Sequence, residues 1–206
     1  MTGNSFLVAV LLAVLGVFQG PKPEPNPGDH AGYYASGQPG APIRLEVFSD
    51  FQCPSCRTFY LDTMRQVMKD YASETRICVV YHDFPLPMHN YAREATRYSL
   101  AAQRMGKDYW LRMSDALYTD QARWAQDGKV DFIAFKILNP EEYGRLRRIL
   151  QDPAINQAVE REIAAAAARK VESTPTFFLV VNGREQKVVG GVTYPTLKNY
   201  LDRLLK

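Results

Sequence analysis

Cysteine and histidine are scarce in this chain of 206 residues, with three of each. Three cysteines are too few for the disulfide framework that holds small secreted domains together. Lysine and arginine form no long run, and the formal net charge is only +3. Nothing therefore indicates nucleic acid or an anionic membrane surface as a partner. What remains is an ordinary globular composition with its chemistry confined to a few residues.

The sequence also lacks an apolar stretch long enough to cross a bilayer as a helix. The longest runs from Phe6 to Phe18, whereas a spanning helix needs roughly 20 residues. This length suits the hydrophobic region of a signal peptide, although residues 1–5 carry no Lys or Arg and no A-x-A site follows. We predict that residues 1–20 are a signal peptide or N-terminal anchor of an exported, extracytoplasmic protein. A short buried helix is the alternative.

Proline and glycine are concentrated in the next segment, residues 21–41. Such a composition disfavours periodic structure and predicts a semi-extended linker. The folded domain is therefore expected over residues 42–206, a length that allows one sizeable core with an inserted subdomain.

Hydrophobic patterns in this domain predict an α/β fold. Strands are expected at residues 43–49, 77–81, 176–181 and 187–189, with a hairpin turn at Asn182-Gly183. Helices are expected from residue 54, over about 90–170, and over 195–205. Because a strand–helix–strand unit implies a parallel crossover, these elements predict a mixed central sheet with helices on both faces and an all-helical insertion at about 90–170.

The motif that carries chemistry is Cys53-Pro54-Ser55-Cys56, which follows a predicted strand and opens a predicted helix. A helix N-terminus stabilises a thiolate, and the thiolate is the nucleophile of disulfide exchange. We therefore expect Cys53, at that end, to be the attacking sulfur and Cys56, one turn further, to be the resolving one. Pro54 fixes the turn, and Ser55 offers a hydroxyl without the positive charge that a His would add.

Structural alternatives to a redox motif are weaker. A zinc site needs four ligands, and only Cys78 and three scattered histidines remain, so no metal is predicted. An inert disulfide across C-x-x-C would close a tiny loop and gain little stability. Cys78 lies in the apolar run 77–81 and is predicted to be buried as a small hydrophobic residue, with a regulatory or intermolecular thiol as the alternative.

Residues 46–56 resemble the active-site segment of the DsbA-like thioredoxin-fold oxidoreductases, in the branch with S-D-F-x-C-P-x-C. Residues 81–86 and 173–178 resemble two further segments of that branch, and Gly190-Gly191 resembles its late glycine pair. The resemblance covers about 42–206 and implies a thioredoxin fold. It also implies a cis peptide bond before Pro175, beside the disulfide, where the Thr174 backbone could pair with a substrate strand. An ordinary strand start is the alternative.

The resemblance further implies a buried acid beneath the resolving cysteine. Glu46 is the candidate, because it lies in the middle of an apolar strand, where its pKa would be raised and it could exchange a proton with Cys56. A glutamate facing solvent is the alternative. Asp50 is expected to shape the loop, and His82 and His89 are expected to be structural or surface residues.

These observations predict a protein thiol:disulfide oxidoreductase that needs no cofactor besides the redox-active Cys53–Cys56 disulfide. Its partners would be the thiols and disulfides of exported proteins and a redox partner that resets the pair, which the resemblance implies to be membrane-bound and quinone-linked. Oxidation is favoured, because exported proteins need disulfides, and an intermediate reduction potential is expected. Reductase and isomerase activities remain alternatives. A monomer is expected, since the linker does not resemble a dimerisation segment.

Two other classes of function stay open. In a binding module the cysteines would be incidental, and changing Cys56 to Ser would leave function intact. In a glutathione-dependent conjugating or isomerising enzyme, glutathione binding would survive the loss of Cys56. Aromatic side chains of the helical block are expected in the core more than in a peptide groove; they are Tyr109, Trp110, Tyr118 and Trp124.

Overall fold

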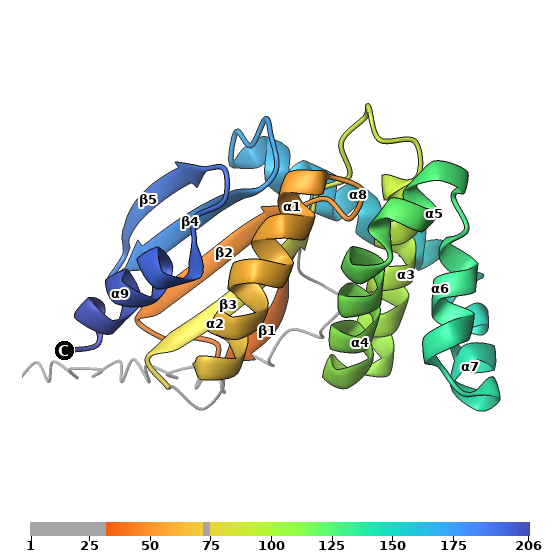
Figure 1. Cartoon of the computed structure of the whole chain (residues 1–206), viewed down its shortest axis with the longest axis horizontal. Coiled ribbons are helices and arrows are strands. Elements are labelled where there is room, and N and C mark those ends of the chain that lie inside the picture. Colours follow the sequence, from red (N-terminus) through yellow and green to blue (C-terminus); the bar gives the residue numbers. More distant parts are fainter. Residues whose placement is uncertain (1–31, 72–74) are drawn as a thin grey trace, which may run out of the picture.

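The computed structural model describes residues 32–71 and 75–206. The predicted signal peptide or anchor, and the linker up to residue 31, lie outside these residues. A five-stranded sheet forms the centre, in the order β1-β3-β2-β4-β5 (Figure 1). β2 and β3 are parallel, and the other neighbours are antiparallel. The strands are β1 (Tyr33–Gly37), β2 (Ile43–Ser49), β3 (Ile77–Asp83), β4 (Thr176–Val181) and β5 (Arg184–Val189).

The two central strands agree with the sequence prediction. β2 has the predicted bounds, and β3 extends two residues beyond them, to Asp83. Every residue of β3 is buried, as expected of a strand covered on both faces. The parallel register brings Ser49 opposite Asp83 where these two strands end. Both strands thus deliver their last residues to the same edge of the sheet.

The predicted linker is wrong over its second half. Tyr33–Gly37 forms the edge strand β1, which pairs antiparallel with β3. The Tyr33 ring packs against Trp110 with centroids 5.1 Å apart, and Ala35 is buried. A short aromatic run can therefore complete a sheet edge even when Pro and Gly surround it. Gly37 has φ +73°, and a Cβ there would meet the backbone of Ile77.

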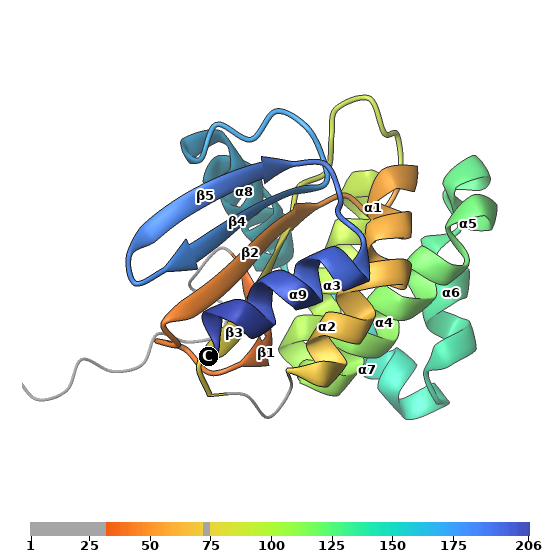
Figure 2. The same ribbon diagram turned by 60° about the vertical axis from the view of Figure 1, so that its left-hand side comes forward.

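Helices cover both faces of the sheet, as predicted. α1 (Pro54–Phe59), the π-helical segment η1 (Tyr60–Met64) and α2 (Arg65–Asp70) form one continuous helix. This helix and α9 (Tyr194–Leu204) lie on one face, and α8 (Pro153–Ala168) lies on the other (Figure 2). The mixed sheet and its covering helices confirm the predicted thioredoxin fold.

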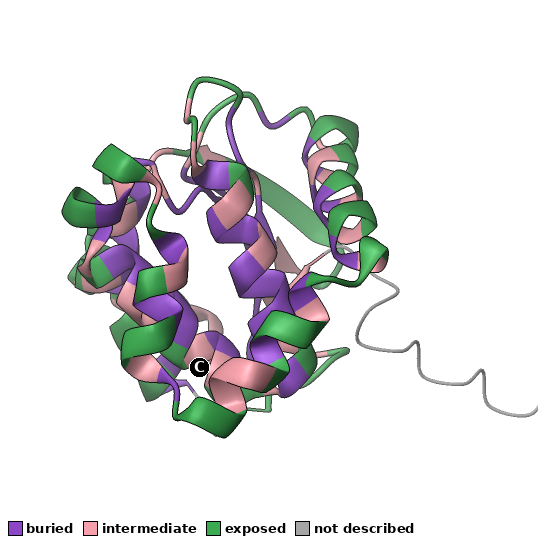
Figure 3. Ribbon diagram, turned by 90° about the vertical axis from the view of Figure 1, so that its right-hand side faces the viewer, coloured by how far each residue is buried: buried purple, intermediate pink, exposed green. Residues whose placement is uncertain are grey.

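The segment between β3 and β4 is entirely helical where regular structure occurs, in agreement with the predicted insertion. Besides α8 it contains α3 (Ala92–Met105), α4 (Lys107–Thr119), α5 (Gln121–Asp127), α6 (Val130–Ile137) and α7 (Pro140–Leu150). The start predicted at Asn139 is confirmed by a capping box with Glu142. These helices turn buried surfaces inward and exposed surfaces outward (Figure 3). Trp110, Trp124 and Tyr118 are each only 1% exposed, which confirms core packing, while Tyr109 is half-buried at the edge of that core.

Side chains of the sheet divide between two cores. Leu45 and Val47 join the main core, with α1, η1, α2 and α9 and part of the insertion. Phe48 and Phe178 instead form a small second cluster with residues of α8 and its C-terminal end. The division follows the alternation of a strand, in which successive side chains point to opposite faces. None of the helices in the described part of the chain is long and apolar enough to span a membrane.

Candidate active site

Cys53 lies where the turn after β2 becomes the helix α1. Its backbone is extended, with φ −75° and ψ 121°, and its carbonyl oxygen accepts the hydrogen bond from the Arg57 N–H. Pro54 occupies the first helical position, where a missing N–H costs nothing. Both thiols are free in the structure. Both residues are buried, but Cys53 keeps 7% of its surface exposed whereas Cys56 has none.

The surroundings of Cys53 favour its thiolate. A hydrogen bond from Cys56 and the backbone N–H groups of Cys56 and Ser55 together lower the pKa of Cys53 from 9.0 to about 5, against the opposing effect of burial. These N–H groups belong to the first turn of the helix, where no carbonyl partner is available within the helix. The predicted stabilisation by the helix N-terminus therefore has identifiable donors.

The pKa of Cys56 is shifted in the opposite direction, upward. Burial raises the pKa of its thiol well above 9.0, and the neighbouring Cys53 raises it further. The Asp50 N–H donates to the Cys56 sulfur at 3.4 Å, and a hydrogen bond with Ser49 also acts on it, but both only partly offset burial. Cys53 is therefore easily deprotonated to a thiolate, whereas Cys56 stays a thiol.

The segment before β4 approaches Cys53 from the other side. The Thr174–Pro175 peptide bond is cis, as the resemblance implied. The Cys53 thiol donates to the Thr174 carbonyl oxygen at 3.4 Å. The Thr174 hydroxyl is buried, and its interaction with the Cys53 sulfur helps to lower the pKa of that thiol. The Thr174 carbonyl oxygen thus accepts a hydrogen bond from the Cys53 thiol, and the Thr174 hydroxyl favours the Cys53 thiolate.

Two side chains of the active-site turn fix it to the rest of the fold. Asp50, 1% exposed, accepts from the backbone N–H groups of Gln52 and Leu86 at 2.7 Å each and contacts His89 Nδ1 at 2.8 Å. Gln52 accepts from the Tyr91 N–H at 2.8 Å. The loop after β3 is thereby held beside the cysteines. Asp50 shapes the loop, as predicted.

The helical insertion contributes a further clamp. The Gln121 side-chain amide, at the start of α5, donates to the carbonyl oxygens of Phe51 and Cys53 at 2.7 and 3.0 Å. In return, the Gln52 side-chain amide donates a hydrogen bond to the Ala125 carbonyl oxygen of α5 at 3.2 Å. α5 lies within the predicted helical block but was not distinguished as a helix of its own, and a glutamine 68 residues after Cys53 gives no local signal. Sequence reasoning therefore missed Gln121.

Comparison with known proteins agrees with this geometry. A family model described as thioredoxin matches residues 30–203. The chain belongs to the thioredoxin family. It is 22% identical over 174 residues to a probable disulfide bond formation protein D of Bacillus cereus, covering 82% of this chain and 77% of that protein. The relative agrees with the DsbA-like resemblance, and the thiol–disulfide oxidoreductase class predicted from the sequence is confirmed.

Solved structures share the fold. A thioredoxin-like oxidoreductase of Silicibacter pomeroyi DSS-3 superposes with a TM-score of 0.66 at 22% identity, over 86% of this chain and 92% of that one. DsbA2 of Pseudomonas aeruginosa superposes with a TM-score of 0.65 at 23% identity, over 84% of this chain and 94% of that one.

In this thioredoxin-family chain, Gly190-Gly191 packs beside the active site. The Gly190 N–H donates to the Pro175 carbonyl oxygen at 2.8 Å, and a Cβ on Gly191 would crowd Phe59 at 3.1 Å.

The position predicted for Glu46, beneath Cys56, is wrong. Glu46 is buried, as expected, but it lies on the α8 face of the sheet and not beneath Cys56. Arg44 and Arg169 bind its carboxylate at 2.6 and 2.8 Å. The strand alternates, so Leu45 and Val47 face α1 while Glu46 faces the opposite side. Ser49, which was not singled out from the sequence, and Tyr118, which was expected only in the core, lie near Cys56 instead, with their hydroxyl oxygens 2.7 Å apart.

The remaining candidate groups lie elsewhere or are structural. Cys78 is 1% exposed, and burial raises its pKa to about 11. His82 is buried and bonds to Glu162 at 3.2 Å. Within residues 32–71 and 75–206 no cluster of acidic, histidine or cysteine side chains could hold a metal.

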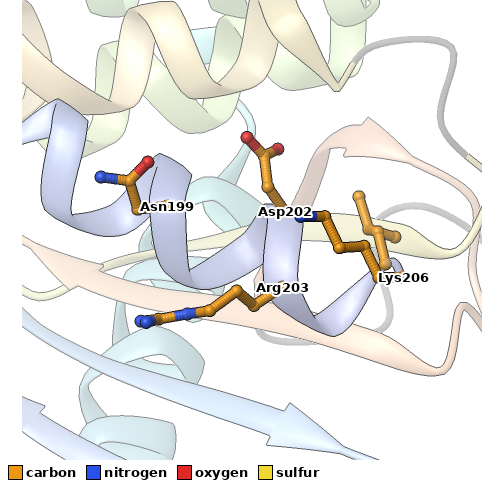
Figure 4. Close-up of a pocket in the computed structure, with 5 residues that line it drawn as sticks. Asn199, Asp202, Arg203 and Lys206 are labelled. Atoms are coloured by element: carbon orange, nitrogen blue, oxygen red, sulfur yellow. The ribbon is translucent and has the colours of Figure 1, made fainter.

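A surface hollow lies at the end of α9, far from the cysteines. Leu205 beside it accepts from Arg76, just before β3 begins, whereas Cys53 follows the end of β2. Four of its five lining residues are polar and none is a cysteine; the residues are Asn199, Asp202, Arg203, Leu205 and Lys206 (Figure 4).

Proposed function

We propose that Cys53 and Cys56 are the redox-active pair with which this chain exchanges disulfides with exported proteins, acting as an oxidase. The contrast between the two sulfurs supports this proposal most strongly. Cys53 is partly accessible and its pKa is lowered to about 5, while Cys56 is inaccessible and its pKa is raised. Exchange through a mixed disulfide needs one sulfur that meets the substrate and one that does not.

The proposed oxidation runs in two displacements. A substrate thiolate attacks the Cys53 sulfur, the Cys53–Cys56 bond breaks, and Cys56 leaves with the electron pair and takes a proton. A second substrate thiolate then attacks the substrate sulfur of the mixed disulfide, and Cys53 leaves as a thiolate. Two electrons have passed to the cysteine pair, and a redox partner must remove them.

Stabilising the Cys53 thiolate favours this direction. A better-stabilised leaving thiolate makes the oxidised pair a stronger oxidant. Known members of this fold range from a thiolate pKa of about 3.5 at about −120 mV to about 7 at about −270 mV. The value of about 5 for Cys53 lies between these limits. We therefore expect a potential of about −200 mV, where the pair can donate disulfides to exported proteins.

The segment around Pro175 supports substrate contact. The Thr174 carbonyl oxygen lies 3.4 Å from the attacked sulfur, and an extended substrate segment could pair with backbone at this position. We propose that Thr174 and Pro175 bind the substrate beside Cys53, with Pro54 and Ser55, both exposed, at its edge. The proposed setting is extracytoplasmic, with residues 1–20 as signal or anchor, the chain a monomer, and no cofactor required.

Trapping of mixed disulfides tests the proposal. Cys56→Ser removes the resolving sulfur, so the full-length variant should accumulate disulfide-linked substrates that reductant releases. Cys53→Ser should trap none, and Cys78→Ala, which alters the buried third cysteine, should behave like wild type. Equal trapping by the Cys53→Ser variant, or none by Cys56→Ser while both remain folded, would refute the proposal.

A further inference from the structure

The backbone of Asp50 contacts both cysteines of the pair. Its N–H donates to the Cys56 sulfur at 3.4 Å, and its carbonyl oxygen accepts from the Cys53 N–H at 3.1 Å. Cys56 has no exposed surface, so water does not supply a donor in place of this N–H. The position of the Asp50 backbone therefore affects how well negative charge on the Cys56 sulfur is stabilised.

The Asp50 side chain fixes that backbone through three contacts. Its carboxyl group has no exposed surface, and its two oxygens accept from the backbone N–H groups of Gln52 and Leu86 at 2.7 Å each. The third contact is His89 Nδ1, 2.8 Å from Oδ2. A carboxylate oxygen can only accept a hydrogen bond, so His89 provides the hydrogen of this contact. Of these three donors, His89 alone is a side chain and can be changed by substitution.

His89 is suited to keep the carboxylate in place. A buried charge that loses a hydrogen-bond donor is destabilised more than a neutral group would be. His89 is closer to solvent than Asp50, with 20% of its side chain exposed, and its backbone N–H donates to the Leu86 carbonyl oxygen at 3.0 Å. Without the His89 ring, water would reach the carboxylate from this side, and the turn that carries Asp50 would relax.

We infer that His89 is a positioning residue, which holds the Asp50 N–H against the Cys56 sulfur and thereby raises the reduction potential of the pair. When a thiolate attacks Cys53, the Cys53–Cys56 bond breaks and Cys56 takes the electron pair. In the reduced pair Cys56 is hydrogen-bonded to the Cys53 thiolate, so its sulfur shares in the negative charge. The Asp50 N–H then makes a stronger hydrogen bond than it makes to a neutral disulfide sulfur.

This difference stabilises the reduced form more than the oxidised form, which makes the pair a better oxidant. The inference rests on the proposed function and names a residue that regulates its site.

The reduction potential of the full-length protein in glutathione buffers tests this role. His89→Ala removes the ring, whereas His89→Asn keeps an N–H donor near the position of Nδ1. In His89→Ala the equilibrium constant for reduction by glutathione should fall about tenfold, as expected for the loss of one hydrogen bond to a charged group. This change corresponds to a potential that is lower by about 30 mV. His89→Asn should keep most of the wild-type potential.

The potential separates this role from a general loss of stability, because a loss that is common to both redox forms cancels in it. His82→Ala is the matched control. It disrupts another histidine–carboxylate pair, with Glu162 of α8, where the His82 ring stacks on Phe48 of the second cluster. It should lower the midpoint of denaturant unfolding and leave the potential unchanged. If His89→Ala does not fold, His89→Leu keeps most of the volume without a donor and should show the same lower potential.

Three results would overturn the inference while leaving the proposed function intact. They are a wild-type potential in the variant without the donor, an equally low potential in His89→Asn, and an equal fall in His82→Ala. The absence of a reversible couple in wild type itself would instead refute the proposed function.

Discussion

The sulfur of Cys53 lies 3.4 Å from the carbonyl oxygen of Thr174, a residue 121 positions further along the chain. The fold creates this contact by placing β4 directly beside β2, antiparallel, so that the start of β4 meets the end of β2. The helical insertion lies between the two segments in sequence yet does not separate them in space. It adds Gln121 to the same turn.

The titration of Cys53 should report its hydrogen bond with Cys56. The rate of iodoacetamide alkylation of the reduced protein is expected to have a midpoint at about pH 5. Cys56→Ala removes the largest of the groups that lower this pKa, so the midpoint should move upward, towards 9.0. An unchanged midpoint would show that the helix N-terminus and Thr174 suffice on their own. Cys78→Ala is the control and should not shift it.

The stability of the reduced protein should depend on pH through Cys53. Its pKa is depressed in the folded state, so its contribution is fully present above pH 9.0 and is lost as pH falls through about 5. The free energy of unfolding of reduced wild type, minus that of Cys53→Ala, should therefore rise between pH 5 and 8. Denaturant unfolding at several pH values measures the difference, and a flat difference would contradict the depressed pKa.

Gln121 should stabilise the active-site turn. Gln121→Leu leaves the buried Phe51 carbonyl oxygen without its side-chain donor, at a cost of about 1–3 kcal/mol, while the Cys53 carbonyl oxygen keeps the hydrogen bond from the Arg57 N–H. Denaturant unfolding should show this loss. The matched control is Gln126→Ala on the same helix, where an exposed amide donates to the Ala122 carbonyl oxygen and a change within about 0.5 kcal/mol is expected. Equal losses of stability in the two variants would contradict the claim that Gln121 stabilises the active-site turn.

Glu46 should matter for stability and not for exchange. Glu46→Gln weakens the ion pairs with Arg44 and Arg169 on the face of the sheet away from the cysteines. The midpoint of unfolding is expected to fall, while the rate of disulfide transfer to a reduced unfolded protein stays within about twofold of wild type. A tenfold slower disulfide transfer at unchanged stability would contradict this prediction and show that Glu46 takes part in exchange.

Much of the architecture follows from local patterns in the sequence. β2 alternates apolar with charged residues, β3 begins with a continuous apolar run, and Asn139 with Pro140 and Glu142 carries a complete helix-start signal, so these elements were predictable. Tyr33–Gly37 was not, because its pairing with β3 is a tertiary event that overrides Pro- and Gly-rich flanks.

The candidate site divides in the same way. The C-x-x-C motif and its helix are contiguous, whereas Gln121 reaches the site only through the fold. The orientation of Glu46 had an overlooked signal. Arg44 and Glu46 alternate with Ile43, Leu45 and Val47, which places the charged pair together on the face away from the main core.

The reduction potential of the Cys53–Cys56 pair tests the central claim most directly. It can be measured by equilibrating the full-length protein with glutathione buffers and quantifying the two redox forms. The proposed function predicts one reversible two-electron couple at about −200 mV. A value near about −270 mV would indicate a reductase, and the absence of a reversible couple would contradict the assignment of these cysteines as the working pair.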